Sequence, residues 1–181
     1  MNAGSIGLLL LPVFILLQPP AALVDAQASP KNQSSSLCRD EEKIIFYCAV
    51  APGARIVSLC ASNALDHRRG YLQYRYGKPG AIELQFPEAR ANTQLAFRYA
   101  HYFRAQVDRT EISFDNRDYR YTLFDYFEGD VKPAIITAGV RVSKHGTKGQ
   151  EVELLCHGKP TGKLGGLETV SPRDHDNTLN Q

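Results

Sequence analysis

The sequence contains no tryptophan and only one methionine among its 181 residues, and its aromatic residues are nine tyrosines and eight phenylalanines. Tyrosine and phenylalanine are enriched in strands, so this composition favours strands over helices. The chain also lacks a large excess of positive or negative charge: its formal net charge is +2, and the basic residues are dispersed. Nucleic-acid binding needs a concentrated basic surface, so the sequence predicts no nucleic-acid partner.

The motifs of common enzyme classes are missing as well. The chain has no GxSxG, no HExxH and no HxK pair with a downstream aspartate. His101 lies in an aromatic segment, where a packed or edge residue is a better interpretation than a catalytic base. Residues 158–164 resemble a phosphate loop, but their glycine spacing is one short and Leu164 replaces the Ser/Thr. We therefore expect no catalytic residue and no cofactor, with a hydrolase of unfamiliar type left as an alternative.

No two cysteines have CxxC spacing, which argues against a zinc site or another metal site. An even number of cysteines in an exported chain predicts two disulfides, and three pairings are possible. Cys48 and Cys60 flank the turn-forming residues 51–54, so a cross-strand Cys48–Cys60 disulfide is favoured. The second disulfide would then join Cys38 to Cys156, the first ordered residues to the last strand.

The N-terminal apolar stretch, residues 7–17, is too short to span a bilayer. Small residues at Val24 and Ala26, and again at Ala26 and Ala28, suit cleavage by signal peptidase. No lysine or arginine precedes the stretch, so an uncleaved anchor stays an alternative. We interpret residues 1–26 as a cleaved signal peptide and 27–37 as a disordered leader. The sequence then predicts a periplasmic protein without stable membrane insertion.

The rest of the chain reads as successive β-hairpins separated by turns. Apolar residues alternate with polar ones in several segments, and no helical period of useful length separates them. The segment 97–104 is expected to be a strand, and 91–96 could form a short helical turn. We expect an all-β domain over 38–157, an antiparallel meander of about eight or nine strands that forms a barrel or a β-sandwich stapled by two disulfides. Residues 158–181 are expected to form a flexible C-terminal tail.

Alternation along the strands also predicts which side chains reach the surface. If Leu72, Tyr74 and Tyr76 face inward, their neighbours face outward. Tyrosine and arginine are enriched at protein–protein hot spots, although sheet exteriors often carry both without a partner. The outward Tyr/Arg set predicted to bind a partner is Tyr71, Arg75, Arg98, Tyr102, Arg104, Arg120 and Tyr126.

Four blocks carry a family resemblance: residues 42–48, 57–62, 71–77 and 152–156. With them, residues 38–157 resemble small exported proteins of Gram-negative bacteria, in particular the periplasmic immunity proteins that accompany type VI secretion phospholipase D effectors. The resemblance implies a protein without catalytic activity that binds a toxic phospholipase and blocks it sterically, protecting the producing cell.

Two other binding functions stay open. Residues 147–154 are mildly similar to a strand entry of small periplasmic lysozyme inhibitors. A lipid- or glycan-binding β-barrel is the second possibility, and it would require an apolar or aromatic-lined cavity.

Overall fold

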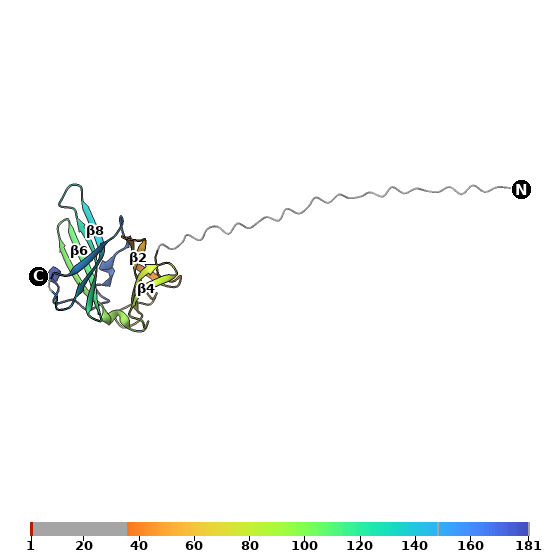
Figure 1. Ribbon diagram of the computed structural model, residues 1–181, viewed down its shortest axis with the longest axis horizontal. Helices are drawn as coiled ribbons and strands as arrows, with labels where there is room; N and C mark the ends of the chain where they lie inside the picture. The colour runs from red at the N-terminus through yellow and green to blue at the C-terminus, as the bar shows by residue number, and fades with distance from the viewer. Residues whose placement is uncertain (2–35, 148, 181) are drawn as a thin grey trace. The chain divides into compact units, whose positions relative to one another are not determined.

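The computed structural model describes Met1, residues 36–147 and residues 149–180. Within these residues the chain forms two five-stranded antiparallel sheets (Figure 1). The expected signal peptide and most of the expected leader lie outside the described residues. No helix of the described part is long and apolar enough to cross a membrane.

The strand order is β10-β1-β2-β3-β4 in the first sheet and β5-β6-β7-β8-β9 in the second. Apart from β10, which returns to pair with β1, each strand lies beside its neighbour in sequence. The strands are β1 (Lys43–Val50), β2 (Arg55–Ala61), β3 (Leu72–Lys78), β4 (Ala81–Phe86), β5 (Arg98–Arg104), β6 (Val107–Asn116), β7 (Tyr119–Glu128), β8 (Ile135–Lys144), β9 (Glu151–Leu155) and β10 (Thr161–Gly162). Three short 3-10 helices are η1 (Thr93–Ala96), η2 (Leu164–Leu167) and η3 (Thr178–Asn180).

The all-β antiparallel meander predicted from the sequence is confirmed, as are the two disulfides. Of the two arrangements left open, the chain adopts the sandwich, because the two sheets do not close into a barrel. The segment expected to be a strand at 97–104 is β5, and the helical turn expected before it is η1.

Aromatic side chains from both sheets form the centre of the core. The ring of Phe114 on β6 lies 5.1 Å from Tyr74 and 4.4 Å from Phe86, both in the first sheet. It also stacks on Tyr121 of β7 at 5.0 Å. Each large apolar side chain buried in this way contributes about 1.5–3 kcal/mol. Packing between these inward-facing rings thus holds the two sheets face to face.

The β1–β2 hairpin corrects the expected disulfide pairing. Its turn occupies residues 51–54, so Cys48 lies opposite Val57 and Cys60 lies opposite Ile44. The two cysteines are three positions out of register, because the turn is centred earlier in the chain than a direct pairing requires. The disulfides formed are Cys38–Cys60 and Cys48–Cys156, which leave no free cysteine.

The disulfide of Cys156 joins the two sheets at one edge. The Cys156 amide donates to the carbonyl oxygen of Ala138 in β8 at 2.8 Å, and the same residue bridges Val50 at the end of β1. The chain after β9 therefore passes from the second sheet to the first. Two disulfides also indicate an oxidising, exported compartment.

Residues 158–180 do not form the expected tail. β10 pairs with β1, and Leu164 and Leu167 of η2 are buried in the core. Further along, the Asp174 amide donates to the carbonyl oxygen of Tyr99 at 2.7 Å, so the C-terminal segment lies along the edge strand β5. The polar, glycine-rich composition of this segment favoured a tail, but its residues Leu164 and Leu167 pack in the core.

Replacing each disulfide by a pair of serines should reduce stability unequally. The Cys48–Cys156 disulfide spans 108 residues and the Cys38–Cys60 disulfide spans 22. In the chain-entropy model, their loss costs about 5 and about 3 kcal/mol respectively. Urea unfolding of C48S/C156S and C38S/C60S measures both values. A larger loss in C38S/C60S would contradict this account of the fold.

Candidate functional site

The inner face of the second sheet extends beyond the sandwich core at one end. Strands β6, β7 and β8 have ten residues each, whereas β1 to β4 have between six and eight. Exposure rises along the inward positions of β5: Tyr99 is buried, His101 is half-buried and Phe103 is 71% exposed. We call this uncovered region the open end of the second sheet.

Strand register arranges the open end in two rows of side chains. The row next to the core consists of His101, Thr110, Asp125 and Ala138. The row at the rim consists of Phe103, Asp108, Phe127 and Ile136. Because side chains alternate along a strand, these residues share the face that carries the core. Carboxylates thus occupy inward positions of β6 and β7 where the first sheet no longer covers them.

A cavity of about 450 Å³ lies between the open end and the segment 159–168. Such a volume is typical of small-molecule sites. The sheet wall carries Tyr99, His101, Asp108, Thr110, Asp125, Phe127 and Ile136. The opposite wall carries Lys159, Pro160, Gly162, Lys163, Gly165 and Glu168.

The second wall is held in place by its own packing. Lys163 donates its amide to the carbonyl oxygen of Ile45 at 3.0 Å, and the leucines of η2 anchor the segment in the core. Gly162 has a φ of +86°, and a Cβ there would overlap the carbonyl oxygen of Ile45. Only glycine allows this close approach to β1, so Gly162 fixes where the adjacent lysine emerges.

Ionisable groups face one another across the cavity. His101 Nε2 donates to Asp108 Oδ1 at 2.9 Å. Burial raises the pKa of Asp125, and the charge of Asp108 adds to this effect, while Lys163 and Lys159 oppose it. Burial also raises the pKa of Tyr99 to about 12. The sheet wall is therefore acidic and incompletely hydrated, with two cations facing it.

Burial and bonding decide whether the hydroxyl and thiol groups of the described residues meet the needs of nucleophilic catalysis. Nucleophilic catalysis needs a hydroxyl or thiol activated by an adjacent base. Thr110 is the register partner of His101, but its side chain is buried and hydrogen-bonded to Tyr99. All four cysteines of the chain are in disulfides. What the geometry offers is a shaped cavity with charges of both signs.

Large apolar side chains are exposed near the cavity, and two of them, Phe127 and Ile136, line it. Five large apolar side chains are exposed at this end of the second sheet and in the loop between β7 and β8, and we call them the apolar rim: Phe103 (71% exposed), Phe127 (42%), Val131 (39%), Ile135 (48%) and Ile136 (47%). Phe103, Phe127 and Ile136 take inward positions, whereas Ile135 takes an outward position beside Glu128. Soluble proteins seldom expose so many apolar residues together without a function. Two ion pairs flank this apolar rim: Arg104 Nη2 lies 2.6 Å from Asp130 Oδ2, and Arg109 pairs with Glu128.

Five of the seven residues predicted to bind a partner lie on the outer face of the second sheet. They are Arg98, Tyr102, Arg104, Arg120 and Tyr126, at outward positions of β5 and β7. Arg98 and Arg104 are exposed, while Tyr102 is half-buried.

These side chains form contacts within the chain. Arg98 donates to the carbonyl oxygens of Leu95 and Phe97, and Arg104 pairs with Asp130. Arg120 pairs with Asp174 of the C-terminal segment at 2.6 Å. The hydroxyl of Tyr126 donates to Glu111. Arg104 lies next to the apolar rim, because its ion-pair partner Asp130 directly precedes Val131. Strand alternation thus predicted correctly that these five side chains face outward, and their part in partner binding stays a prediction.

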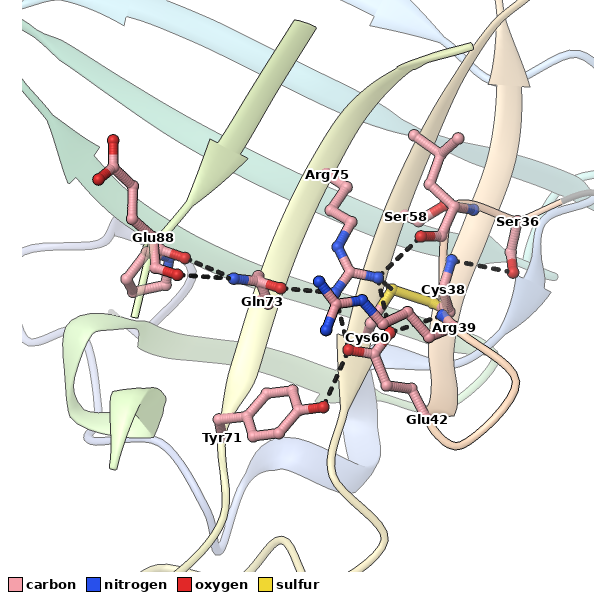
Figure 2. A network of polar contacts seen from close by, with 12 residues as sticks. Ser36, Cys38, Arg39, Glu42, Ser58, Cys60, Tyr71, Gln73, Arg75 and Glu88 are labelled. Atoms are coloured by element: carbon pink, nitrogen blue, oxygen red, sulfur yellow. Dashed lines mark hydrogen bonds and ion pairs between the residues drawn. A yellow bond between two sulfur atoms is a disulfide. The ribbon is translucent and has the colours of Figure 1, made fainter. Parts of the chain in front are cut away.

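The structure corrects the prediction for Arg75, whose side chain is only 1% exposed (Figure 2). Arg75 does face away from the core, beside Ser58 of β2, as alternation requires. However, residues 36–42 cover this face of the first sheet and are fastened there by the Cys38–Cys60 disulfide. Tyr71 belongs to the same region, and its hydroxyl donates to Glu42 at 2.9 Å.

Arg75 instead forms a buried, bidentate ion pair. Its Nη1 and Nη2 donate to the two carboxylate oxygens of Glu42 at 2.6 and 2.7 Å (Figure 2). Nη1 also donates to the carbonyl oxygen of Leu37 at 2.8 Å, and Nη2 to Gln73 Oε1 at 2.5 Å. Burial opposes ionisation of Glu42, but hydrogen bonds from Arg75, the Arg39 amide and Tyr71 outweigh it and lower its pKa. This cluster holds the N-terminal cover on the sheet.

Glu42 also lies close to the sulfur atoms of Cys38 and Cys60, a grouping that could hold a metal ion if the thiols were free. Both sulfurs belong to one disulfide. Metal ligation requires the thiolate, so the grouping is a structural one.

Sequence reasoning missed the residues of the cavity, although one pattern was available. Asp108 and Asp125 stand at inward positions of strands whose central inward residues, Ile112, Phe114 and Leu123, are apolar. Charged residues at such positions indicate either a partner or an uncovered site. Lys159 and Lys163 were assigned to a tail, and no local pattern shows that their segment folds back over β5 to β7.

Models of known protein families, curated proteins and solved structures yield no match to this chain.

The substitution Arg75→Ala should unfold the protein more readily. It leaves the Glu42 carboxylate buried without its partner, which costs about 3–5 kcal/mol. Arg98→Ala is the matched control, because Arg98 is exposed and donates only to backbone carbonyls, so a change within about 0.5 kcal/mol is expected. Urea unfolding distinguishes the two. An Arg75→Ala variant as stable as the control would show that the ion pair does not hold the cover.

Stability should also decline in acid because of Glu42. Its pKa is lowered in the folded protein from an ordinary value of 4.5, so its contribution is present above that pH and is lost as pH falls through the lower folded value. Unfolding free energies measured between neutral pH and about pH 3 should decline less steeply in Glu42→Gln than in the unmodified protein. Parallel pH profiles would assign the acid sensitivity to other groups.

Proposed function

We propose that this chain is an exported immunity protein that binds a phospholipase D-type effector of a type VI secretion system and blocks it sterically in the periplasm. The observation that carries the proposal is the apolar rim at the open end of the second sheet. The family resemblance of residues 38–157 supplies the identity of the partner.

The apolar rim has the composition of a protein-binding surface. Phe103 and Phe127 offer aromatic area, and Ile136 extends it onto β8 on the same face. Hot spots at interfaces are large side chains that become fully desolvated and are surrounded by polar groups. The ion pairs Arg104–Asp130 and Arg109–Glu128 provide such polar surroundings.

Rigidity favours tight binding by this surface. Most residues of the apolar rim lie on paired strands, whose backbone is already ordered before docking. Docking then costs little additional conformational entropy. A rigid apolar projection that enters the mouth of a phospholipase would deny lipid headgroups access to the enzyme.

The compartment agrees with this proposal. The two disulfides indicate an oxidising environment, which suits a protein that meets its partner outside the cytosol.

A second candidate function is small-ligand binding, favoured by the cavity of about 450 Å³ beneath the same rim. Tyr99, Phe127 and Ile136 supply an aromatic and apolar part of its lining, as expected for a lipid- or glycan-binding protein. Both functions would use the open end.

The test of the immunity function is a pull-down with the phospholipase D-type product of a flanking gene, followed by a lipase assay. The unmodified protein should bind the enzyme and abolish lipid hydrolysis. Phe103→Ser and Ile136→Ser should each weaken binding by about tenfold or more, since truncating a hot-spot residue costs about 2 kcal/mol.

Leu95→Ser serves as the matched control, because Leu95 is 58% exposed but belongs to η1. Its affinity should equal that of the unmodified protein. Weaker binding by Tyr102→Ala with unchanged binding by both rim variants would place the interface on the outer face. Inhibition of lysozyme in place of the phospholipase would refute the proposed partner.

A further inference from the structure

The two walls of the cavity carry complementary charges. Asp108 and Asp125 project from the sheet wall, while Lys159 and Lys163 belong to the opposite wall, which also carries Glu168. The pKa of Asp125 responds to both lysines, so these three groups act on one another across the cavity. The cavity is therefore polarised, with anions on the sheet and cations on the covering segment.

Within the described residues, the side chains of Asp125, Lys159 and Lys163 are engaged by no hydrogen bond or close ion pair, and the lysines act on Asp125 only through their charge. Asp125 is half-buried, and a carboxylate that has lost water gains most from a hydrogen-bonding cation. The carboxylate of Asp108, by contrast, is hydrogen-bonded to His101, with Nε2 and Oδ1 2.9 Å apart. Asp125 is thus the group best placed to receive an ammonium ion.

The position of the apolar side chains gives the ligand a direction. Phe127 and Ile136 occupy the rim row and line the mouth, whereas His101, Thr110 and Asp125 occupy the row beneath. A ligand that satisfies both rows places its charged end inside and an apolar chain against the mouth.

We propose that the cavity binds the zwitterionic aminoethyl-phosphate group of an amphiphile. The primary ammonium donates to the carboxylate of Asp125, since an ammonium offers three hydrogen-bond donors. The phosphate lies between Lys159 and Lys163, which bind it as point charges. The apolar chain leaves along Phe127 and Ile136. A free aminoethyl phosphate and a lipid headgroup share this chemistry, and the inference does not rest on the proposed toxin binding.

Titration calorimetry of the full exported protein tests the charged part of this site. O-Phosphoethanolamine should bind saturably, and at least about tenfold more tightly than ethanolamine or inorganic phosphate, each of which reaches one wall only. Lysophosphatidylethanolamine should bind more tightly than O-phosphoethanolamine, because its chain covers the apolar mouth. Equal affinity for O-phosphoethanolamine and phosphate, or no saturable binding of any probe, would overturn the proposal.

Two variants test which part of the ligand each wall of the cavity binds. Asp125→Asn should weaken O-phosphoethanolamine binding by about tenfold or more without weakening phosphate binding. The double substitution Lys159→Gln and Lys163→Gln should weaken both, and these exposed side chains lie outside the core, so folding is preserved. Lys144→Gln is the control, because Lys144 is an exposed lysine at the far end of β8. Unchanged binding in the double variant would overturn the site even if Asp125→Asn did not fold.

Flotation with vesicles separates the two ligand sources. Binding to vesicles that contain phosphatidylethanolamine and phosphatidylglycerol, without binding to vesicles of phosphatidylglycerol alone, supports a lipid headgroup. Binding to neither, with saturable binding of O-phosphoethanolamine in calorimetry, supports the free compound.

Discussion

The unequal length of the two sheets shapes the rest of this molecule. Ten-residue strands in the second sheet pack against strands of six to eight residues in the first, so one end of the inner face has no opposing sheet. Alternation continues through that end and brings His101, Asp108 and Asp125 to a face that is apolar elsewhere. The C-terminal segment covers part of the gap and leaves the cavity and the apolar rim. Both proposed binding functions follow from this overhang.

The opposite face of the molecule is closed by different means. Residues 36–42 cover the outer face of the first sheet, and they are held by the Cys38–Cys60 disulfide and the buried Arg75–Glu42 pair. A buried ion pair adds little net stability over an apolar contact, but breaking it is costly. The pair fixes the position of residues 36–42 on the sheet, because two carboxylate oxygens bind two guanidinium nitrogens in a single geometry. Arg75 and Ser58 on this face are buried as a result.

Strand alternation allowed the fold class and most strands to be predicted, because a period of two is a local property. It also assigned Arg75 to the correct side of β3. The exposure of Arg75 could not be predicted, since it depends on a segment more than thirty residues earlier in the chain. The disulfide pairing depended on the centre of one turn, and the cavity on a C-terminal segment whose polar composition conceals Leu164 and Leu167. Errors therefore arose wherever distant segments meet.

The central claim is that this protein binds through the open end of its second sheet. The most direct measurement is a series of amide correlation spectra recorded while O-phosphoethanolamine is added to isotopically labelled protein. The account predicts shift changes confined to residues 101–110, 125–127 and 159–168, which form the cavity and its rim. Changes centred on residues 36–42 and β3, with the open end unaffected, would contradict it.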